Sequence, residues 1–183
     1  DTCRGINMAN GCVYKKVDIG DNKFKYELES GTELISDSTQ ITASTEAVDV
    51  SGLNIVGFQI ITSHVDNEQP CLATANTQDD EVAYEGGILN NTVTNSGTQQ
   101  TLESNQYWIE SALVDSVTND SSASIDSLLE GGSIGIGEYS FTISVNANSG
   151  GRPPVCNNGD SDESVDWTIS VIALEYTLTE IKS

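Results

Sequence analysis

The sequence predicts an all-β protein, an antiparallel β-sandwich or jelly-roll-like single domain with at most one or two short helical turns. Many short segments alternate apolar and polar side chains at period two, which is the pattern of half-buried strands. The hydrophobic fraction is only 37%, which is low for a globular domain and typical of thin sheets with much surface and little interior. Because the 183-residue chain has no internal repeat and no low-complexity linker, we expect one domain over residues 1–183.

The N-terminal part of the chain predicts a hairpin. Residues 13–19 (VYKKVDI) and 23–29 (KFKYELE) both alternate at period two. The residues between them favour a tight turn: Gly20, Asp21 and Asn22.

The middle of the chain predicts a buried strand among weaker ones. Residues 32–50 are consistent with short, half-exposed strands, and residues 53–62 (LNIVGFQIIT) are apolar on both faces, as in a central strand. Residues 66–80 have the composition of a loop, and residues 81–95 predict one or two weak strands that include Leu89. Within the central strand we expect two faces, one with Val56, Phe58 and Ile60 and the other with Ile55, Gly57 and Ile61.

Residues 106–117 (QYWIESALVDSV) are ambiguous between a helix and a strand. Ile109, Leu113 and Val117 would form a helical stripe, but the β-branched content and the neighbouring strands favour a strand. Residues 124–130, which two glycines follow, predict one short helical turn.

The C-terminal third gives the clearest strand patterns. Residues 134–145 alternate cleanly, and residues 165–181 alternate over their whole length except for a phase slip at Ile172 and Ala173, which predicts a β-bulge. A strand of about 16 residues is much longer than usual. We therefore expect it to bend between two sheets or to extend beyond its own domain as a candidate edge.

The charge is strongly negative and unevenly distributed. The chain has 7 Lys and Arg residues against 28 Asp and Glu residues, a formal net charge of −21. This charge repels phosphate backbones, so nucleic-acid binding is excluded as a main role, and anionic membrane surfaces are disfavoured. No apolar run approaches the length of a membrane span.

The first 30 residues hold five of the bases and five of the acids, so all of the excess negative charge lies outside them. A segment rich in lysine and an acidic body are complementary between copies, and heterologous contacts of that kind generate filaments. Residues 1–30 are therefore a candidate N-terminal extension or hairpin that donates a strand to a neighbour. The alternative is that this hairpin packs on its own domain and its lysines neutralise nearby carboxylates.

Four cysteines without CxxC spacing predict two disulfides in an oxidising compartment. Three pairings are open; we favour a short loop from Cys3 to Cys12 and a long link from Cys71 to Cys156, with four buried free thiols as the alternative. Because the chain begins at Asp1 and not at Met, we expect an extracellular or cell-surface protein whose signal peptide has been removed.

Two acidic stretches predict a calcium site. The loop around Gly159 carries Asp160, Asp162 and Glu163, and Asp79 and Asp80 follow Cys71. Calcium takes six to eight hard oxygen ligands, and a Cys71–Cys156 link would bring the two stretches together. The order of residues does not match the EF-hand loop, and the alternative is two solvated acidic loops.

Two sequons, at Asn90 and Asn119, predict N-glycosylation in a secreted chain. Tyr107, Trp108 and Trp167 are candidates for an aromatic platform that binds sugars. Trp167 fits the core phase of its strand, so Trp108 is the exposed candidate.

The sequence predicts no enzyme. His64 is the only histidine, lies at a predicted strand end where surface or turn positions are usual, and has no nucleophile motif to serve. Paired carboxylates are unspecific among so many acids, and the glycine-rich residues 131–137 precede a strand, unlike a nucleotide-binding loop. The leading expectation is a self-assembling structural subunit of an extracellular filament, pilus-like fibre or virion surface, linked by β-strand complementation. The alternative is a secreted, adhesin-like module that binds carbohydrate or a surface.

Overall fold

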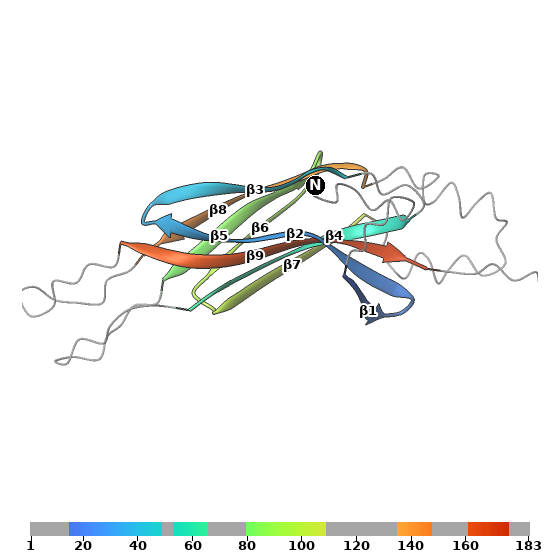
Figure 1. The fold of residues 1–183 in the computed structure, drawn as a ribbon, viewed down its shortest axis with the longest axis horizontal. Coiled ribbons are helices and arrows are strands. Elements are labelled where there is room, and N and C mark those ends of the chain that lie inside the picture. The colour runs from blue at the N-terminus through green and yellow to red at the C-terminus, as the bar shows by residue number, and fades with distance from the viewer. Residues whose placement is uncertain (1–14, 49–52, 66–79, 109–134, 148–160, 176–183) are drawn as a thin grey trace, which may run out of the picture.

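The computed structural model describes residues 15–48, 53–65, 80–108, 135–147 and 161–175. These residues form two antiparallel sheets that face each other, and they contain no helix (Figure 1). The larger sheet has the order β1-β2-β9-β4-β7, and the smaller has the order β3-β8-β5-β6. The strands are β1 (Lys16–Gly20), β2 (Lys23–Ser36), β3 (Thr39–Val48), β4 (Asn54–His64), β5 (Glu81–Ile88), β6 (Asn91–Gly97), β7 (Thr101–Tyr107), β8 (Gly137–Asn146) and β9 (Asp162–Leu174).

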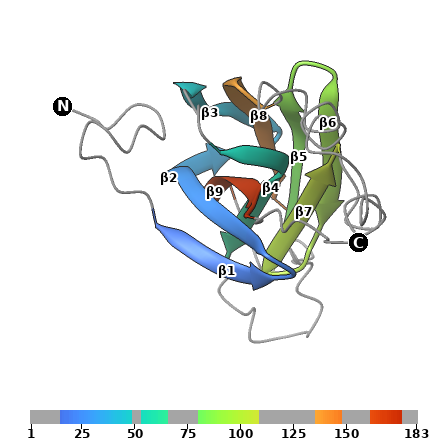
Figure 2. The same cartoon turned by 90° about the vertical axis from the view of Figure 1, so that its right-hand side faces the viewer.

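The strand order is that of a jelly roll. From β2 to β9 the chain passes from one sheet to the other at every connection except the β5–β6 hairpin, and β2, the first of these strands, pairs with β9, the last. Two four-stranded sheets wound in this way make the jelly roll, and β1 is an extra strand at one edge of the larger sheet (Figure 2). The prediction of an all-β antiparallel sandwich is confirmed.

The predicted N-terminal hairpin is confirmed for the described residues, and residues 13 and 14 of its first strand lie outside them. Asp21 and Asn22 have φ values of 54° and 57°, as a two-residue type I′ turn requires, and Lys23 pairs with Gly20 across the turn. The expected short strands in residues 32–50 are instead the end of the long strand β2 and the single strand β3.

Strands β4 and β9 occupy the middle of the larger sheet, because β9 pairs with β2 on one side and with β4 on the other. The central position predicted for β4 is confirmed. Strand β9 lies in one sheet and is not an edge, so the expectation that it would bend between sheets or serve as an edge within the described residues is wrong. Its length is favoured because it is covered by neighbours along both sides.

The predicted bulge lies in the neighbouring strands and not in β9. The register of β4 against β9 shifts between Ile55 and Gly57, opposite Ala173 and Ile172, so the extra residue is Val56. Because this residue resets the phase of β4, Ile55 joins the same core cluster as Phe58, and their expected placement on opposite faces is wrong.

The core lies between the sheets and is centred on aromatic residues. Phe58 is fully buried, and its ring centroid lies 5.6 Å from that of Tyr139 and 5.8 Å from that of Phe141. Strand β8 alternates as predicted and buries Tyr139, Phe141, Ile143 and Val145. The Tyr139 hydroxyl donates to the Gly135 carbonyl oxygen at 2.8 Å, which satisfies its buried polar group.

Other predicted segments have different bounds or lie outside the described residues. Of the strand expected over residues 106–117, only residues 106–108 are described, and the first two of them end β7, which begins at Thr101. The rest of that segment and the predicted helical turn lie in residues 109–134, outside the described residues. Leu89 is a turn residue with a φ of 48° and an exposed fraction of 88%, and not part of a strand. Among the described residues no helix is long and apolar enough to cross a membrane.

Candidate functional site

One side of the sandwich is closed by its own side chains. Strands β6 and β7, the edges of the two sheets, lie next to each other (Figure 2). The Tyr84 hydroxyl donates to Ser104 Oγ at 2.7 Å, and Asn95 Nδ2 donates to the Glu103 carbonyl oxygen at 3.4 Å. These bonds use polar groups of both strands, so this side offers little to a partner.

The other side of the larger sheet ends in an open edge. Strand β1 pairs only with the first part of β2, from Lys23 to Tyr26, and the Glu27 amide donates to the Lys15 carbonyl oxygen at 3.2 Å. Beyond that bond, no strand of the described chain pairs with the outer edge of β2 as far as Ser36. The edge is exposed to solvent: Leu34 has an exposed fraction of 64%.

The open edge of β2 carries acidic side chains, and its backbone packs closely against a tryptophan of β9. Glu29 and Glu33 are exposed and follow the register shift between Glu27 and Glu29. Gly31 pairs with Trp167, and a Cβ atom at Gly31 would lie only 2.7 Å from the indole ring. The glycine therefore lets a core tryptophan lie flat against the edge strand, as the core phase predicted for Trp167 requires.

The basic residues gather at the N-terminal hairpin. All the lysines of the described chain belong to this region, whereas strands β3, β5, β6 and β8 contain no Lys or Arg. Thus one sheet carries the positive charge and the other carries none.

Two of these lysines pair within the molecule, as the alternative interpretation of the hairpin predicts. Lys15 Nζ lies 3.3 Å from a Glu27 carboxylate oxygen, and Lys16 pairs with Glu175. The hydrogen bond between Lys16 and Glu175 raises the pKa of Lys16 and lowers the pKa of Glu175. Both pairs are solvent-exposed, so they contribute little to stability.

Lys23 and Lys25 have no acidic partner among the described residues. The Lys23 ammonium lies 5.4 Å from the centroid of the Tyr107 ring, and Lys25 Nζ donates to Gln59 Oε1 at 3.3 Å. The hairpin thus has positive charge that no carboxylate of the described residues pairs with.

The predicted calcium ligands are not brought together by the described residues. Asp79 and Asp160 lie outside them, Asp80 and Glu163 are buried, and Asp162 is half-buried. The described part of the chain contains no group of three or more His, Cys, Asp or Glu residues placed to hold a metal ion. Calcium binding therefore stays a prediction.

All four cysteines lie outside the described residues, but the strand register bears on their pairing. His64, which precedes the segment with Cys71, pairs with Val165, which follows the segment with Cys156. Both segments therefore attach at one end of the sandwich (Figure 1), and the Cys71–Cys156 pairing stays a prediction that this topology allows. Among the glycosylation candidates, Asn119 is not described and Asn90 is exposed in the β5–β6 turn.

The exposed aromatic platform is not found. Trp108 is half-buried: its Nε1 donates to the Ile55 carbonyl oxygen at 2.9 Å and its ring centroid lies 6.3 Å from that of Phe58, so its expected exposure is wrong. His64 is buried, with an exposed fraction of 5%, and is not the surface or turn residue expected. His64 is buried because it continues the alternate buried positions Phe58, Ile60 and Thr62 of β4. Trp108 is half-buried because it follows β7 and its amide donates to the Val56 carbonyl oxygen of β4.

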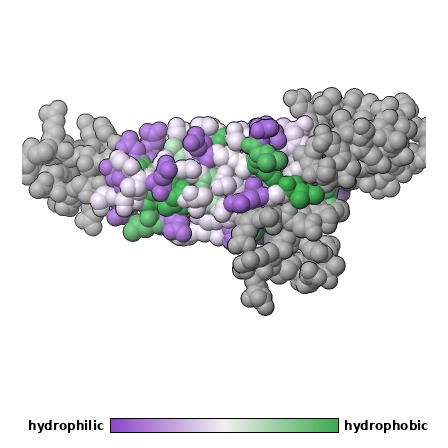
Figure 3. All heavy atoms as spheres, turned by 90° about the horizontal axis from the view of Figure 1, so that it is seen from above, coloured by the Kyte–Doolittle hydropathy of each residue, from purple (hydrophilic) through white to green (hydrophobic). Residues whose placement is uncertain are grey.

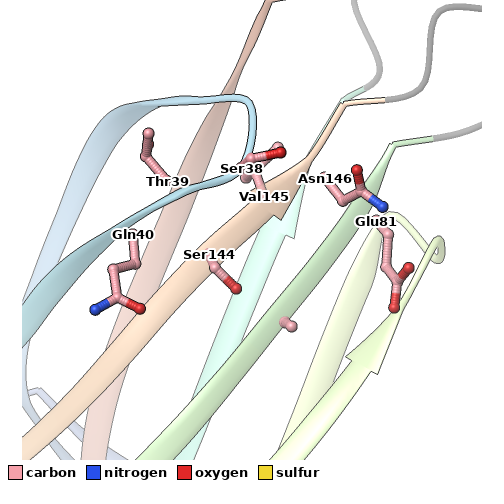
Figure 4. Close-up of a pocket in the computed structure, with 8 residues that line it drawn as sticks. Ser38, Thr39, Gln40, Glu81, Ser144, Val145 and Asn146 are labelled. Atoms are coloured by element: carbon pink, nitrogen blue, oxygen red, sulfur yellow. The ribbon is translucent and has the colours of Figure 1, made fainter.

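A polar depression lies on the outer face of the smaller sheet (Figure 4). Its volume is about 360 Å³, and Gln40, Glu81, Ser144 and Asn146 contribute polar groups. On the face that Figure 3 shows, hydrophobic residues form small separate patches among polar ones. Sequence reasoning missed the depression because its residues come from three strands that are far apart in the chain.

Comparison with known proteins adds no relative: no protein-family model matches the chain, and no curated protein matches it.

Proposed function

We propose that this protein is a structural, self-assembling subunit of an extracellular filament or pilus-like fibre, or of a virion surface. Copies would be linked by β-strand complementation and by pairing of opposite charges. The observation that carries the proposal is the open, acidic edge of β2 in a domain whose basic residues gather at the neighbouring hairpin.

An open sheet edge presents unpaired N–H and C=O groups, and natural proteins usually cover or interrupt such an edge. A long edge left open is therefore suited to accept a strand from another chain. Edge acids and hairpin lysines are complementary between copies, and complementary charge steers association and fixes its orientation.

The test is electron microscopy and sedimentation velocity of the purified protein over a range of concentrations. We expect polymers at low ionic strength and fewer at high ionic strength, since salt screens exposed charges over about 10 Å at 0.1 M. Dispersed monomers under all of these conditions would overturn the proposal.

A secreted module that binds carbohydrate or a surface is the second candidate. It is supported by the polar depression, in which amide, carboxylate and hydroxyl groups could accept and donate hydrogen bonds to a sugar. A glycan array tests it, with Glu81→Gln as the variant that should weaken any binding. Glycan binding by dispersed monomers would favour this candidate over the filament subunit.

A further inference from the structure

We propose that the open edge of β2, from Ser30 to Ser36, accepts strand β1 of a second copy, added antiparallel, and that this contact repeats to form a filament. The inference rests on the proposed function, since it names the surfaces and the direction of that self-assembly. Its partner is another copy of this chain.

The backbone phase of β2 shows which groups the edge offers. The Asp37 amide donates to the Ser161 carbonyl oxygen at 2.8 Å, so at this position the backbone faces β9. Backbone groups along a strand point to alternate sides, and the register with β9 is regular from Glu29 to Ser36. Counting back from Asp37, the N–H groups that face the open edge are those of Ser36, Leu34, Thr32 and Ser30.

The other edges are poorer acceptors. The register of β3 shifts between Ser44 and Ala47, and a bulge of this kind disrupts the row of backbone groups that an incoming strand needs. Strands β6 and β7 are joined through Asn95 and Ser104. Among the edges of the described strands, that of β2 combines length, regular register and exposure.

Strand β1 fits this edge in length and in charge. It is five residues long, shorter than the open part of β2, and no described strand pairs with its outer side. In the antiparallel direction the start of β1, with Lys15 and Lys16, would lie toward the Ser36 end of the acceptor and nearer to Glu33 than to Glu29. Pairing β2 with the β2 of another copy would instead place glutamates against glutamates. Lys15 is held by an exposed ion pair, which is weak, and Lys16 is held by an exposed ion pair and by the Phe24 ring, whose centroid lies 4.2 Å from its ammonium.

The direction of addition decides whether the assembly closes. If β1 of the second copy runs parallel to the acceptor β2, a two-fold axis relates the copies, each accepts the other's β1, and the dimer is closed. If β1 of the second copy runs antiparallel to the acceptor β2, the two copies are related by a rotation of half a turn about an axis parallel to the strands, combined with a translation along that axis. A screw relation of this kind leaves one acceptor and one donor unused at the ends, so the assembly grows as an open filament.

The test compares Leu34→Pro with Leu34→Thr. Proline removes the Leu34 N–H, which faces the open edge and makes no bond to β9, and proline is tolerated on the exposed side of an edge strand. Threonine removes the same apolar side chain but keeps the N–H. We expect the wild type and Leu34→Thr to form filaments and Leu34→Pro to be a folded monomer by circular dichroism and sedimentation.

Each outcome has a distinct meaning. Filaments from Leu34→Pro would overturn this acceptor edge and leave the proposed function standing, and loss of filaments in both variants would assign the effect to the side chain and overturn the N–H assignment. Closed dimers of the wild type would overturn the antiparallel direction, and no assembly of the wild type would overturn the proposed function itself.

Hydrogen exchange on wild-type filaments tests the same edge without a variant. The amides of Ser30, Thr32 and Leu34 should exchange at least about tenfold more slowly than in the monomer, because paired strand amides exchange only on opening, and unchanged exchange would contradict the inference.

Discussion

Deletion of residues 1–22 should leave a folded monomer that no longer assembles. The deletion removes β1, which has four Cα partners in β2. Antiparallel partners exchange two hydrogen bonds at alternate residues, so about four backbone bonds are lost. At about 0.5–1.5 kcal/mol each, they amount to about 2–6 kcal/mol of the 5–15 typical for a domain.

Little side-chain burial is lost with β1, since only Val17 of its five residues is half-buried and the other four are exposed. Among the described residues the core cluster has no member before Phe24, so the deletion removes none of them. We therefore expect cooperative unfolding with a melting temperature lowered by about 5–20 °C, given about 2–4 °C per kcal/mol for a chain of this size.

Calorimetry measures the melting temperature of the truncated protein, and electron microscopy measures its assembly. Full-length protein with Lys15→Gln and Lys16→Gln is the matched control, because it keeps the strand and removes its charge; it should assemble more weakly and with less dependence on salt. A truncated protein that still forms filaments would refute β1 as the donor. A truncated protein without a cooperative unfolding transition would refute the estimate of about 2–6 kcal/mol for the contribution of β1 to the free energy of unfolding.

Four further outcomes are expected. Phe58→Ala should lower the free energy of unfolding by about 3–5 kcal/mol in urea titration, since this fully buried ring lies against three others, and a loss below about 1 kcal/mol would contradict its central place. Burial raises the pKa of the Tyr139 phenol. The stability that this neutral phenol contributes is therefore fully present below its unfolded pKa of about 10 and is lost as pH rises through the higher folded pKa. Absorbance titration should show a phenol that ionises only on unfolding. Calcium should release heat in calorimetric titration and raise the melting temperature, less so in Asp162→Asn, and a flat titration would exclude the ion. Non-reducing peptide mapping should recover Cys71 linked to Cys156, and any other partner for either residue would contradict the pairing.

The fold class was predictable because strands with one buried face carry a period-two pattern. In β8 the inward positions from Tyr139 to Val145 are all apolar and buried, and in the β1–β2 hairpin the turn at Asp21 and Asn22 fixes the phase of both strands. These signals are local in sequence. They need no knowledge of which strands become neighbours.

The first five residues of β7 were not predicted to form a strand, for a physical reason. Strand β7 is an edge strand that buries only Leu102 among its seven residues, so its sequence has almost no apolar alternation to detect. Strand β9 begins at Asp162, earlier than expected, and the acidic side chain of Glu163 is buried opposite Ile35. Hydropathy assigns acidic residues to loops, and only the tertiary pairing with β2 places them in a strand.

The two glycines of β5 reflect close packing against neighbouring strands. In a single sequence, however, a pair of glycines indicates a turn equally well. Gly86 and Gly87 lie inside the strand, where added Cβ atoms would lie 2.1 Å from the Ser140 carbonyl oxygen and 2.0 Å from the Asn91 carbonyl oxygen. Close approach of β8 and β6 on both sides excludes a side chain there. Such a constraint depends on neighbours that the local pattern does not identify.

The open edge follows from the winding of the chain and not from any local motif. In a jelly roll the first strand pairs with the last, so β2 has β9 on one side, and on the other side β1 is its only partner among the described strands. A five-residue strand beside a strand of 14 residues leaves most of the second strand uncovered. Exposed glutamates on the uncovered part disfavour pairing with an identical edge, since like charges would face each other. The same glutamates favour a strand that brings a lysine to them. Strand β1 is neutral overall, with Lys16 and Asp18, but its N-terminal end carries Lys15 and Lys16 at the hairpin that continues this edge. Length and charge therefore select the same partner for the edge, which is the reason to prefer a specific donor strand over indiscriminate edge-to-edge aggregation.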